Sequence, residues 1–177
     1  VIIEAADGSH RNRLLWAQPN GEILHYDKRH LFRMAGEHKH YTAGEKQAVF
    51  KLNGWHVRPL ICYDLRFPVW SRDPHDTDLL LYTANWPAAR RNAWNRLLPA
   101  RAIENLCYVA AVNRVGEDGK GYPYSGDSQV LDYLGDPLLE AGDAEGVFRT
   151  TLRAAHLAKF RSKFPAYHDG DAFELKL

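Results

Sequence analysis

Two apolar runs separated by one long helical pattern constrain the fold of this chain most strongly. Residues 77–86 (TDLLLYTANW) and 107–115 (CYVAAVNRV) each read as one buried strand. Between them, residues 88–106 place apolar side chains at helical spacing: Trp94, Leu97, Leu98, Ala102, Ile103 and Leu106. This order predicts a strand, a helix and a second strand. Pro99, inside the helical pattern, is expected to kink it or to mark a turn.

Other strands are joined by tight turns. Pro19-Asn20-Gly21 and Asn53-Gly54 each stand between two strand-like segments, and the second is the strongest short turn signal in the chain. Further along, the pattern predicts a final meander over residues 128–142 and 145–152, then an amphipathic helix over residues 153–164. Helices that alternate with strands, some joined as hairpins, predict a mixed α/β layered structure rather than a purely parallel sheet.

Length and charge limit the function classes. A chain of 177 residues suits a single domain over residues 1–177. The net charge of +1, from 23 basic and 22 acidic residues, gives no support for a nucleic-acid or membrane-surface partner. No apolar run approaches the ~20 residues of a spanning helix, no signal-peptide pattern opens the chain, and two cysteines make no disulfide framework. We therefore expect a soluble protein of a reducing cytoplasm.

The segment RPLICYDLRFPVW, residues 58–70, ends an apolar strand abruptly at Cys62. A cysteine at the turn from a strand into a helix lies beside free backbone N–H groups and a positive partial charge. Both favour a thiolate and can hold an oxyanion, which suits a nucleophile. The alternative is a small core side chain, as most lone cysteines are. Cys107, in the middle of an apolar run, is predicted to be such a core residue.

Polar residues elsewhere in the chain leave several alternatives open. Lys28 ends a predicted strand, where it is either a solvated surface lysine or, if desolvated beside a thiolate, a cation for an oxyanion. Glu37 alone is one of many loop glutamates. The histidines His30, His38 and His40 lack metal-ligand spacing, so no metal site is predicted.

Two further features lie near predicted strand ends or on the long helix. Asn85 and Trp86 follow a buried strand, where α/β proteins tend to place pocket residues. Arg101 and Glu104 stand three apart on the long helix, so they form either a surface ion pair or a buried pair that orients the site. The glycine-rich loop at 116–126 lacks a phosphate-loop pattern and is read as a surface or pocket-rim loop.

Taken together, six segments resemble one family in content and order. They are YDKRHLF, GEHKHYTAG, LICYDLRFPVW, LLLYTANWP, RAIENLCYVAAVNRVG and YSGDSQVLDYLGD. Their order is that of the carbon–nitrogen hydrolase (nitrilase) superfamily, and the chain is most similar to its omega-amidase-like branch. That branch acts on omega-amides of 2-oxo acids such as 2-oxoglutaramate. The resemblance covers nearly the whole chain.

The resemblance implies a fold and a set of site residues. The fold is a four-layer α-β-β-α sandwich of mixed sheets. Cys62 matches the nucleophile, Lys28 the catalytic lysine and Glu37 the second glutamate of the family, while the backbone N–H of Tyr63 would share the oxyanion site with Lys28. The resemblance implies no metal or organic cofactor, a small-molecule amide substrate and a homodimer.

One departure from the family concerns the general base. The family carries this glutamate upstream of the lysine in a Pro-Glu motif, whereas here only Glu4 and Glu22 precede Lys28, and neither stands in that motif. The first β-α-β portion of the family domain has no counterpart, so we expect residues 1–177 to be the C-terminal part of the domain. The alternative is a relative that has lost its base. Without that base, hydrolysis should be slower by roughly 10²–10⁴-fold.

Substrate recognition is the least constrained feature. A 2-oxo acid amide carries a carboxylate, so the pocket should hold a cation or several N–H donors. Arg66 and Arg114 are the candidates, although Arg66 could instead pair with Asp64 or another acid. Further pocket residues are expected to be Trp86, Asn85, Tyr41 and Tyr124. The alternative functions are nitrile or N-carbamoyl hydrolysis, a nitrilase-like binding or scaffold protein, and, remotely, a metal-dependent phosphoesterase.

Overall fold

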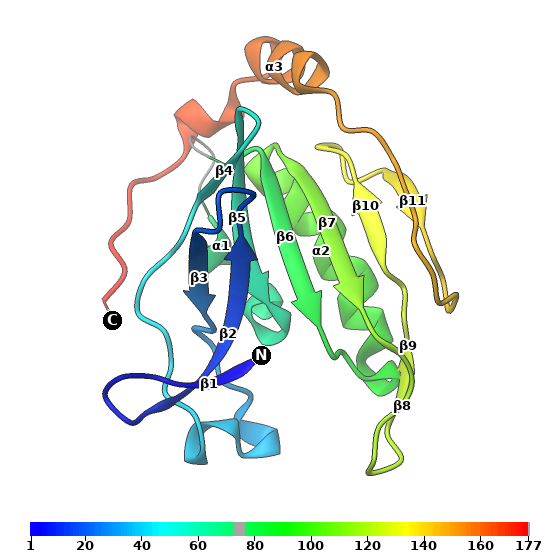
Figure 1. Ribbon diagram of the computed structural model, residues 1–177. Helices are drawn as coiled ribbons and strands as arrows, with labels where there is room; N and C mark the ends of the chain where they lie inside the picture. The colour runs from blue at the N-terminus through cyan, green and yellow to red at the C-terminus, as the bar shows by residue number, and fades with distance from the viewer. Residues whose placement is uncertain (73–76, 177) are drawn as a thin grey trace.

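The largest sheet of the computed structural model, which describes residues 1–72 and 77–176, combines parallel and antiparallel strands (Figure 1). The strands are β1 (Ile2–Glu4), β2 (His10–Ala17), β3 (Ile23–Asp27), β4 (Phe50–Leu52), β5 (Trp55–Ile61), β6 (Leu79–Ala84), β7 (Tyr108–Asn113), β8 (Val115–Glu117), β9 (Pro123–Ser125), β10 (Gln129–Leu131) and β11 (Pro137–Glu140). The α-helices are α1 (Pro68–Ser71), α2 (Arg91–Asn105) and α3 (Ala154–Lys163). Short 3-10 helices are η1 (Arg33–Ala35), η2 (Glu37–Lys39), η3 (Cys62–Arg66), η4 (Ala88–Arg90) and η5 (Ala166–Asp169).

This sheet has six strands in the order β11-β10-β7-β6-β5-β4. β5, β6 and β7 run parallel at its centre, and β4, β10 and β11 pair antiparallel at its two sides. The two apolar runs of the sequence form β6 and β7, and the helical pattern between them forms α2. The predicted mixed α/β structure, with its strand–helix–strand unit and its Asn53-Gly54 hairpin, is therefore confirmed.

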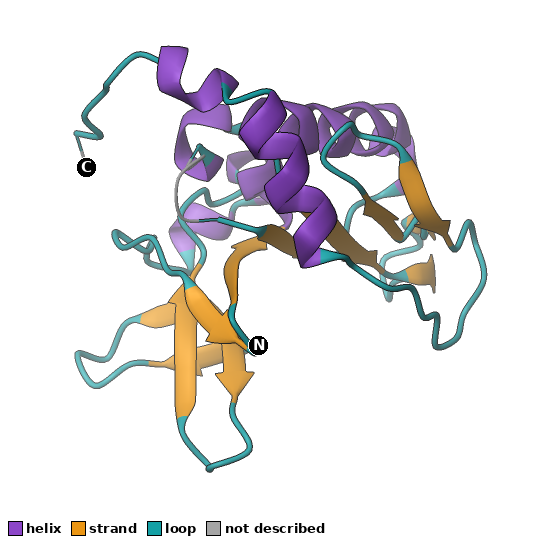
Figure 2. Ribbon diagram, turned by 90° about the horizontal axis from the view of Figure 1, so that it is seen from above, coloured by secondary structure: helices purple, strands orange, loops and turns teal. Residues whose placement is uncertain are grey.

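Helices α1 and α2 cover one face of this sheet, as Figure 2 shows by the gathering of the helices on one side of the strands. The core between them contains Leu80, Tyr82 and Val109 from the strands, packed with Trp94 and Leu98 of α2. These side chains alternate along their strands, as a sheet with one helix-covered face requires. α2 continues through Pro99, so this proline does not mark a turn.

A second, three-stranded antiparallel sheet contains β1, β2 and β3. It packs beside the edge of the larger sheet that β4 and β5 form, where the rings of Trp16 and Phe50 lie 5.3 Å apart. Tyr26 of β3 is 2% exposed and belongs to the common core. This packing brings Lys28, directly after β3, close to the end of β5.

Residues 145–152 are not a strand, contrary to the predicted meander. The segment is largely exposed, and Thr150 Oγ1 makes only a long hydrogen bond of 3.5 Å to Leu138 O of β11. An alternating apolar pattern predicts extended backbone, but it does not supply the neighbour that ladder hydrogen bonds require. Among the described residues, none of the helices has the length and apolar character needed to cross a membrane.

Candidate active site

The predicted site residues lie near the carboxyl ends of the parallel strands, which point downward in Figure 1. Cys62 follows β5, Asn85 follows β6, and Asn113 is the last residue of β7. The carboxyl ends of parallel strands meet at one sheet edge, and this edge commonly carries ligand sites in α/β proteins. Lys28 reaches the same place from the smaller sheet.

Cys62 opens the short helix η3 in a strained backbone conformation. Its φ angle is +45°, in the left-handed region that side chains other than glycine seldom adopt. The side chain is half-buried, and Sγ lies 3.8 Å from the carbonyl oxygen of Asn85. The strand-to-helix turn expected at Cys62 is therefore present. Cys107, by contrast, is fully buried in the core, as predicted.

The ionisation state of Cys62 differs from the sequence expectation. Burial raises the pKa of the Cys62 thiol above its ordinary value of 9.0, more than the nearby charge of Lys28 and the Asn85 carbonyl contact lower it. The charges of Glu37 and Asp64 raise the pKa further. Desolvation is therefore the largest influence on the pKa of this thiol, and the charge of Lys28 is the largest opposing one.

Lys28 is buried, so it is not a solvated surface lysine. The side chain is 3% exposed, and Nζ lies 2.6 and 2.9 Å from the two carboxylate oxygens of Glu37. Glu37 also accepts hydrogen bonds from the Phe32 backbone N–H and, at 3.5 Å, from Asn12 Nδ2. The structure therefore brings Lys28 and Glu37 together in one fixed pair, beside the strand end that carries Cys62.

Gly44 explains why the loop that carries Glu37 follows the strand end so closely. Its N–H donates to the carbonyl oxygen of Lys28 at 2.9 Å, and its own carbonyl accepts from Arg29 Nη1 at 3.2 Å. A Cβ atom at Gly44 would lie 2.2 Å from the carbonyl oxygen of Asp27. Only glycine permits this approach, which fixes the loop against Lys28.

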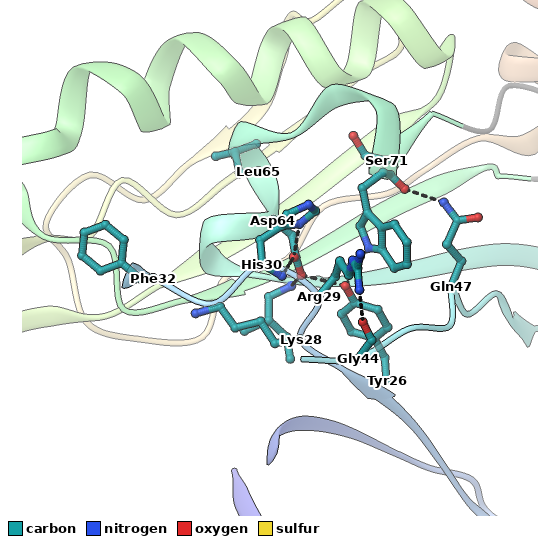
Figure 3. A network of polar contacts seen from close by, with 12 residues as sticks. Tyr26, Lys28, Arg29, His30, Phe32, Gly44, Gln47, Asp64, Leu65 and Ser71 are labelled. Atoms are coloured by element: carbon teal, nitrogen blue, oxygen red, sulfur yellow. Dashed lines mark hydrogen bonds and ion pairs between the residues drawn. The ribbon is translucent and has the colours of Figure 1, made fainter. Parts of the chain in front are cut away.

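Asp64 lies at the centre of a polar network that sequence reasoning missed (Figure 3). The carboxylate is fully buried and accepts from Tyr26 Oη at 2.7 Å, the Ile61 N–H at 2.9 Å and the His30 N–H at 3.0 Å. The Nδ1 atom of His30 lies 2.9 Å from it, and Trp70 Nε1 donates to Tyr26 Oη at 2.8 Å. The one local signal was an acid two residues after the cysteine.

In the Arg101–Glu104 pair the arginine is buried, while the glutamate side chain is 32% exposed. Arg101 is 4% exposed and donates to the carbonyl oxygen of Leu65 at 2.7 and 3.1 Å. Its Nη1 atom lies 3.0 Å from Glu104 Oε1. Since Leu65 belongs to η3, this arginine fastens α2 to the helix that begins with Cys62.

Trp86 and Arg66 form one side of the site. The guanidinium of Arg66 lies over the ring of Trp86, 5.3 Å from its centroid. The backbone N–H of the buried Trp86 donates to Asn113 Oδ1 at 2.7 Å, a positioning contact that the sequence did not indicate. The carboxylate of Asp64 is occupied by other donors. The structure thus places Arg66 on Trp86 and not on Asp64.

Three further predicted site residues, Asn85, Tyr41 and Tyr63, differ in their exposure and in the contacts that they make. The Asn85 side chain is exposed, and its carbonyl is what contacts Cys62. Tyr41 is half-buried, and its N–H is bonded to the Glu37 carbonyl at 2.9 Å. Tyr63 packs its ring against Phe32, with centroids 4.9 Å apart.

Tyr124 lies in the loop that was read as a pocket rim. Burial raises the pKa of Tyr124, and the neighbouring Asp118 raises it further. The Tyr124 hydroxyl donates to Asp118 at 2.9 Å, and the guanidinium of Arg114 lies 4.7 Å from its ring centroid. Arg114 is therefore engaged with the loop.

Arg90 is a cation that the sequence analysis overlooked. Its guanidinium lies 4.8 Å from the ring centroid of Phe32, and its carbonyl accepts from Trp86 Nε1 at 2.8 Å. Neither Arg90 nor Arg66 has an acidic partner within residues 1–72 and 77–176. The available signal was the Arg90-Arg91 pair just before the long helix.

Glu4 and Glu22, the two glutamates before Lys28, lie outside the pair that Lys28 and Glu37 form. Both are exposed on the three-stranded sheet, and Glu22 accepts a hydrogen bond from Gln18 Nε2 at 2.6 Å.

A metal site was not expected, and the part of the chain that the structure describes contains no cluster of three or more His, Cys, Asp or Glu side chains suited to a metal ion.

Comparison with known proteins shows which family the chain belongs to. A model of the carbon–nitrogen hydrolase family matches residues 1–162. The chain belongs to the carbon–nitrogen hydrolase family. It is 52% identical to the omega-amidase YafV of Yersinia enterocolitica over 176 residues, which are 99% of this chain and 68% of that protein. It is 38% identical to the 2-oxoglutaramate amidase of Bacillus subtilis over 162 residues, 89% of this chain and 62% of that protein.

A solved structure agrees with the fold of this carbon–nitrogen hydrolase. The superfamily protein XC1258 from Xanthomonas campestris, described with an arsenic adduct in its active site, superposes with a TM-score of 0.95 at 50% identity. The match covers 99% of this chain and 69% of that one. The resemblance found in the sequence and the assignment as a hydrolase of carbon–nitrogen bonds are thereby confirmed.

Proposed function

We propose that this carbon–nitrogen hydrolase releases ammonia from the omega-amide of a 2-oxo acid, such as 2-oxoglutaramate, through a thioester on Cys62. The names of the relatives, omega-amidase and 2-oxoglutaramate amidase, support the substrate class. The observation that carries the mechanism is the thiol at a strained strand-to-helix turn, influenced by the charge of the buried Lys28. Lys28 is in turn held by Glu37.

The first half of the reaction forms the thioester. The thiol loses its proton as the sulfur bonds to the amide carbon, and the carbonyl electron pair moves onto oxygen. Lys28 stabilises the resulting oxyanion together with the backbone N–H of Tyr63, which has no acceptor within η3 because it is the second residue of that helix. The oxyanion electron pair then re-forms the carbonyl as the carbon–nitrogen bond breaks, the nitrogen takes up the proton that the thiol lost, and ammonia leaves.

The second half returns the thiol. A water molecule attacks the thioester carbon, the carbon–sulfur bond breaks, and the sulfur regains a proton as the 2-oxo diacid departs. Glu37 keeps the Lys28 ammonium in place throughout. Two of the three ammonium hydrogens are directed at its carboxylate, which leaves one for the oxyanion.

Recognition of the substrate carboxylate falls to the arginines of the site. Arg66 and Arg90 each lie over an aromatic ring, and guanidinium groups bind carboxylates through paired hydrogen bonds. With Trp86, Asn85 and Tyr41, they would surround a short chain that ends in a carboxylate. A substrate of this class combines an amide that Cys62 can attack with an anion that the arginines can hold.

We also propose a finer organisation: one domain over residues 1–177, a four-layer sandwich, a homodimer and a cytoplasmic location. The face of the large sheet away from α2 supports the layered arrangement, because Val112 there is 58% exposed. A groove of about 460 Å³ over β7, β10 and β11 includes Val112, Val130, Leu139 and Phe148 in its lining. Sedimentation velocity should give the mass of a dimer, and a monomer at all concentrations would contradict it.

The test of the proposed function compares the two cysteines. Cys62→Ala should retain the far-UV circular dichroism spectrum and release no ammonia from 2-oxoglutaramate. Cys107→Ala, a matched change of a core cysteine, should retain the activity of the unmodified protein. A panel of small amides, nitriles and N-carbamoyl acids tests the substrate class. Turnover by Cys62→Ala would refute the thioester, and a preference for nitriles or N-carbamoyl acids would refute the substrate class.

A further inference from the structure

We infer that Asp64 is a positioning residue that holds the Cys62 turn against Lys28 by joining the two strands that carry them. This inference rests on the proposed roles of Cys62 and Lys28 in one reaction. It assigns a function to a buried acid that the proposed mechanism does not otherwise use.

The positions of the Asp64 partners carry the inference. Tyr26 stands two residues before Lys28 and His30 two residues after it, and both contact the Asp64 carboxylate. Ile61, the residue directly before Cys62, donates its N–H to the same carboxylate at 2.9 Å. One side chain therefore contacts the chain on both sides of the lysine and immediately before the cysteine.

No backbone ladder fixes the distance between these two strands. β3 belongs to the three-stranded sheet and β5 to the six-stranded sheet, and the two sheets share no paired strands among the described residues. The relative position of Lys28 and Cys62 thus depends on side-chain contacts across the two sheets. The Asp64 carboxylate makes such contacts at a site from which water is excluded, since the residue is 0% exposed.

The charge of Asp64 argues against a role in activating the thiol. It raises the pKa of Cys62, in opposition to the effect of Lys28. If Asp64 served only to favour the Cys62 thiolate, its negative charge would oppose that role. The benefit of the carboxylate is therefore geometric, because four polar atoms on three partner residues lie within hydrogen-bond distance of it. Misplacement of reacting groups by about 1 Å can cost on the order of 10²-fold in rate.

The experiment measures how strongly Lys28 acts on Cys62 when the Asp64 network is weakened. Tyr26→Phe removes one donor and keeps the ring. It leaves one buried donor, Trp70 Nε1, without its acceptor, whereas Asp64→Ala would remove the acceptor of several buried groups at once. Tyr108→Phe is the matched control, because Tyr108 is also buried but bonds to the backbone of Arg153, at the opposite end of the parallel strands. The rate of Cys62 alkylation by iodoacetamide at neutral pH is measured by peptide mass in each background, with and without Lys28→Met.

We expect the effect of Lys28 on the rate of Cys62 alkylation to be lost in Tyr26→Phe only. Lys28→Met should slow alkylation by about tenfold, as a shift of about one pKa unit would, in the unmodified protein and in Tyr108→Phe. In Tyr26→Phe the effect should fall below about threefold. A merely stabilising role would lower the melting temperature in both tyrosine variants and leave the Lys28 effect equal.

Two outcomes would overturn the inference: an equal Lys28 effect in the two tyrosine backgrounds, and no Lys28 effect in any background. If Lys28→Met fails to fold, Lys28→Gln serves in the same cycle with the same criteria. Failure of the proposed function looks different, because it would appear as turnover without Cys62 or as Cys62 alkylating no faster than Cys107.

Discussion

At the scale of single residues, the thiol of Cys62 is subject to opposing influences. Burial raises its pKa most, and the charge of Lys28 lowers it. Alkylation requires the thiolate, so the rate should still be rising as the pH passes 9.0, the ordinary pKa of the group. A rate that levels off below neutral pH would contradict this account, because it would indicate a thiolate already formed in the resting protein.

Loss of Lys28 should affect both the reaction and this pH profile. Lys28→Ala is expected to reduce turnover by roughly 10²–10³-fold, as for loss of an oxyanion donor. It should also move the alkylation profile to higher pH, since the removed charge lowered the pKa of Cys62. Lys51→Ala, which removes an exposed lysine of β4, is the control and should change neither quantity. A loss below about threefold for Lys28→Ala would argue against its role.

The residues that could be found from the sequence are those with a local signal. Cys62 ends an apolar run, and the motif resemblance identified Lys28 and Glu37, which the structure brings together. Asp64 has only its place two residues after the cysteine as a local signal, because its partner Tyr26 is 38 positions away in the chain. Local sequence indicated the helix start at Cys62, but it could not indicate the burial that raises the pKa of this thiol.

At the scale of elements, the turn from β3 through η2 is held in place by a single close approach. Gly44→Ala should destabilise the protein by about 1–3 kcal/mol, because the added methyl group would meet the backbone of Asp27. Chemical denaturation measures this loss. Gly119→Ala is the matched control, since a Cβ there meets nothing within 4 Å, and it should be neutral to within about 0.5 kcal/mol. Equal stability of the two variants would show that the loop moves aside without cost.

Elements were predictable where one pattern determines both conformation and partner. The apolar runs became β6 and β7, and the Asn53-Gly54 turn joined β4 to β5. Residues 145–152 show the limit, because their extended pattern was recognised while their lack of a paired neighbour was not. The same limit applies to Pro99, since packing of α2 on the sheet keeps the helix continuous through a residue that disfavours it.

At the scale of the whole molecule, the mixed character of the sheet followed from the sequence, but its strand order did not. β10 pairs beside β7, and β8 and β9 form a separate two-stranded sheet between them in the chain. Such pairings depend on contacts between residues distant in sequence. The site could not be assembled from local patterns for the same reason, because it forms only where β3 and its loop pack beside the ends of β5 and β6.

The most direct test of the account is the mass of the protein during turnover. The protein is mixed with 2-oxoglutaramate, quenched in acid and measured as an intact chain and as peptides. We expect an acyl adduct on the peptide that carries Cys62 and none on the peptide that carries Cys107. Ammonia release with the adduct on Cys107, or with no adduct in the unmodified protein and undiminished turnover in Cys62→Ala, would contradict the account.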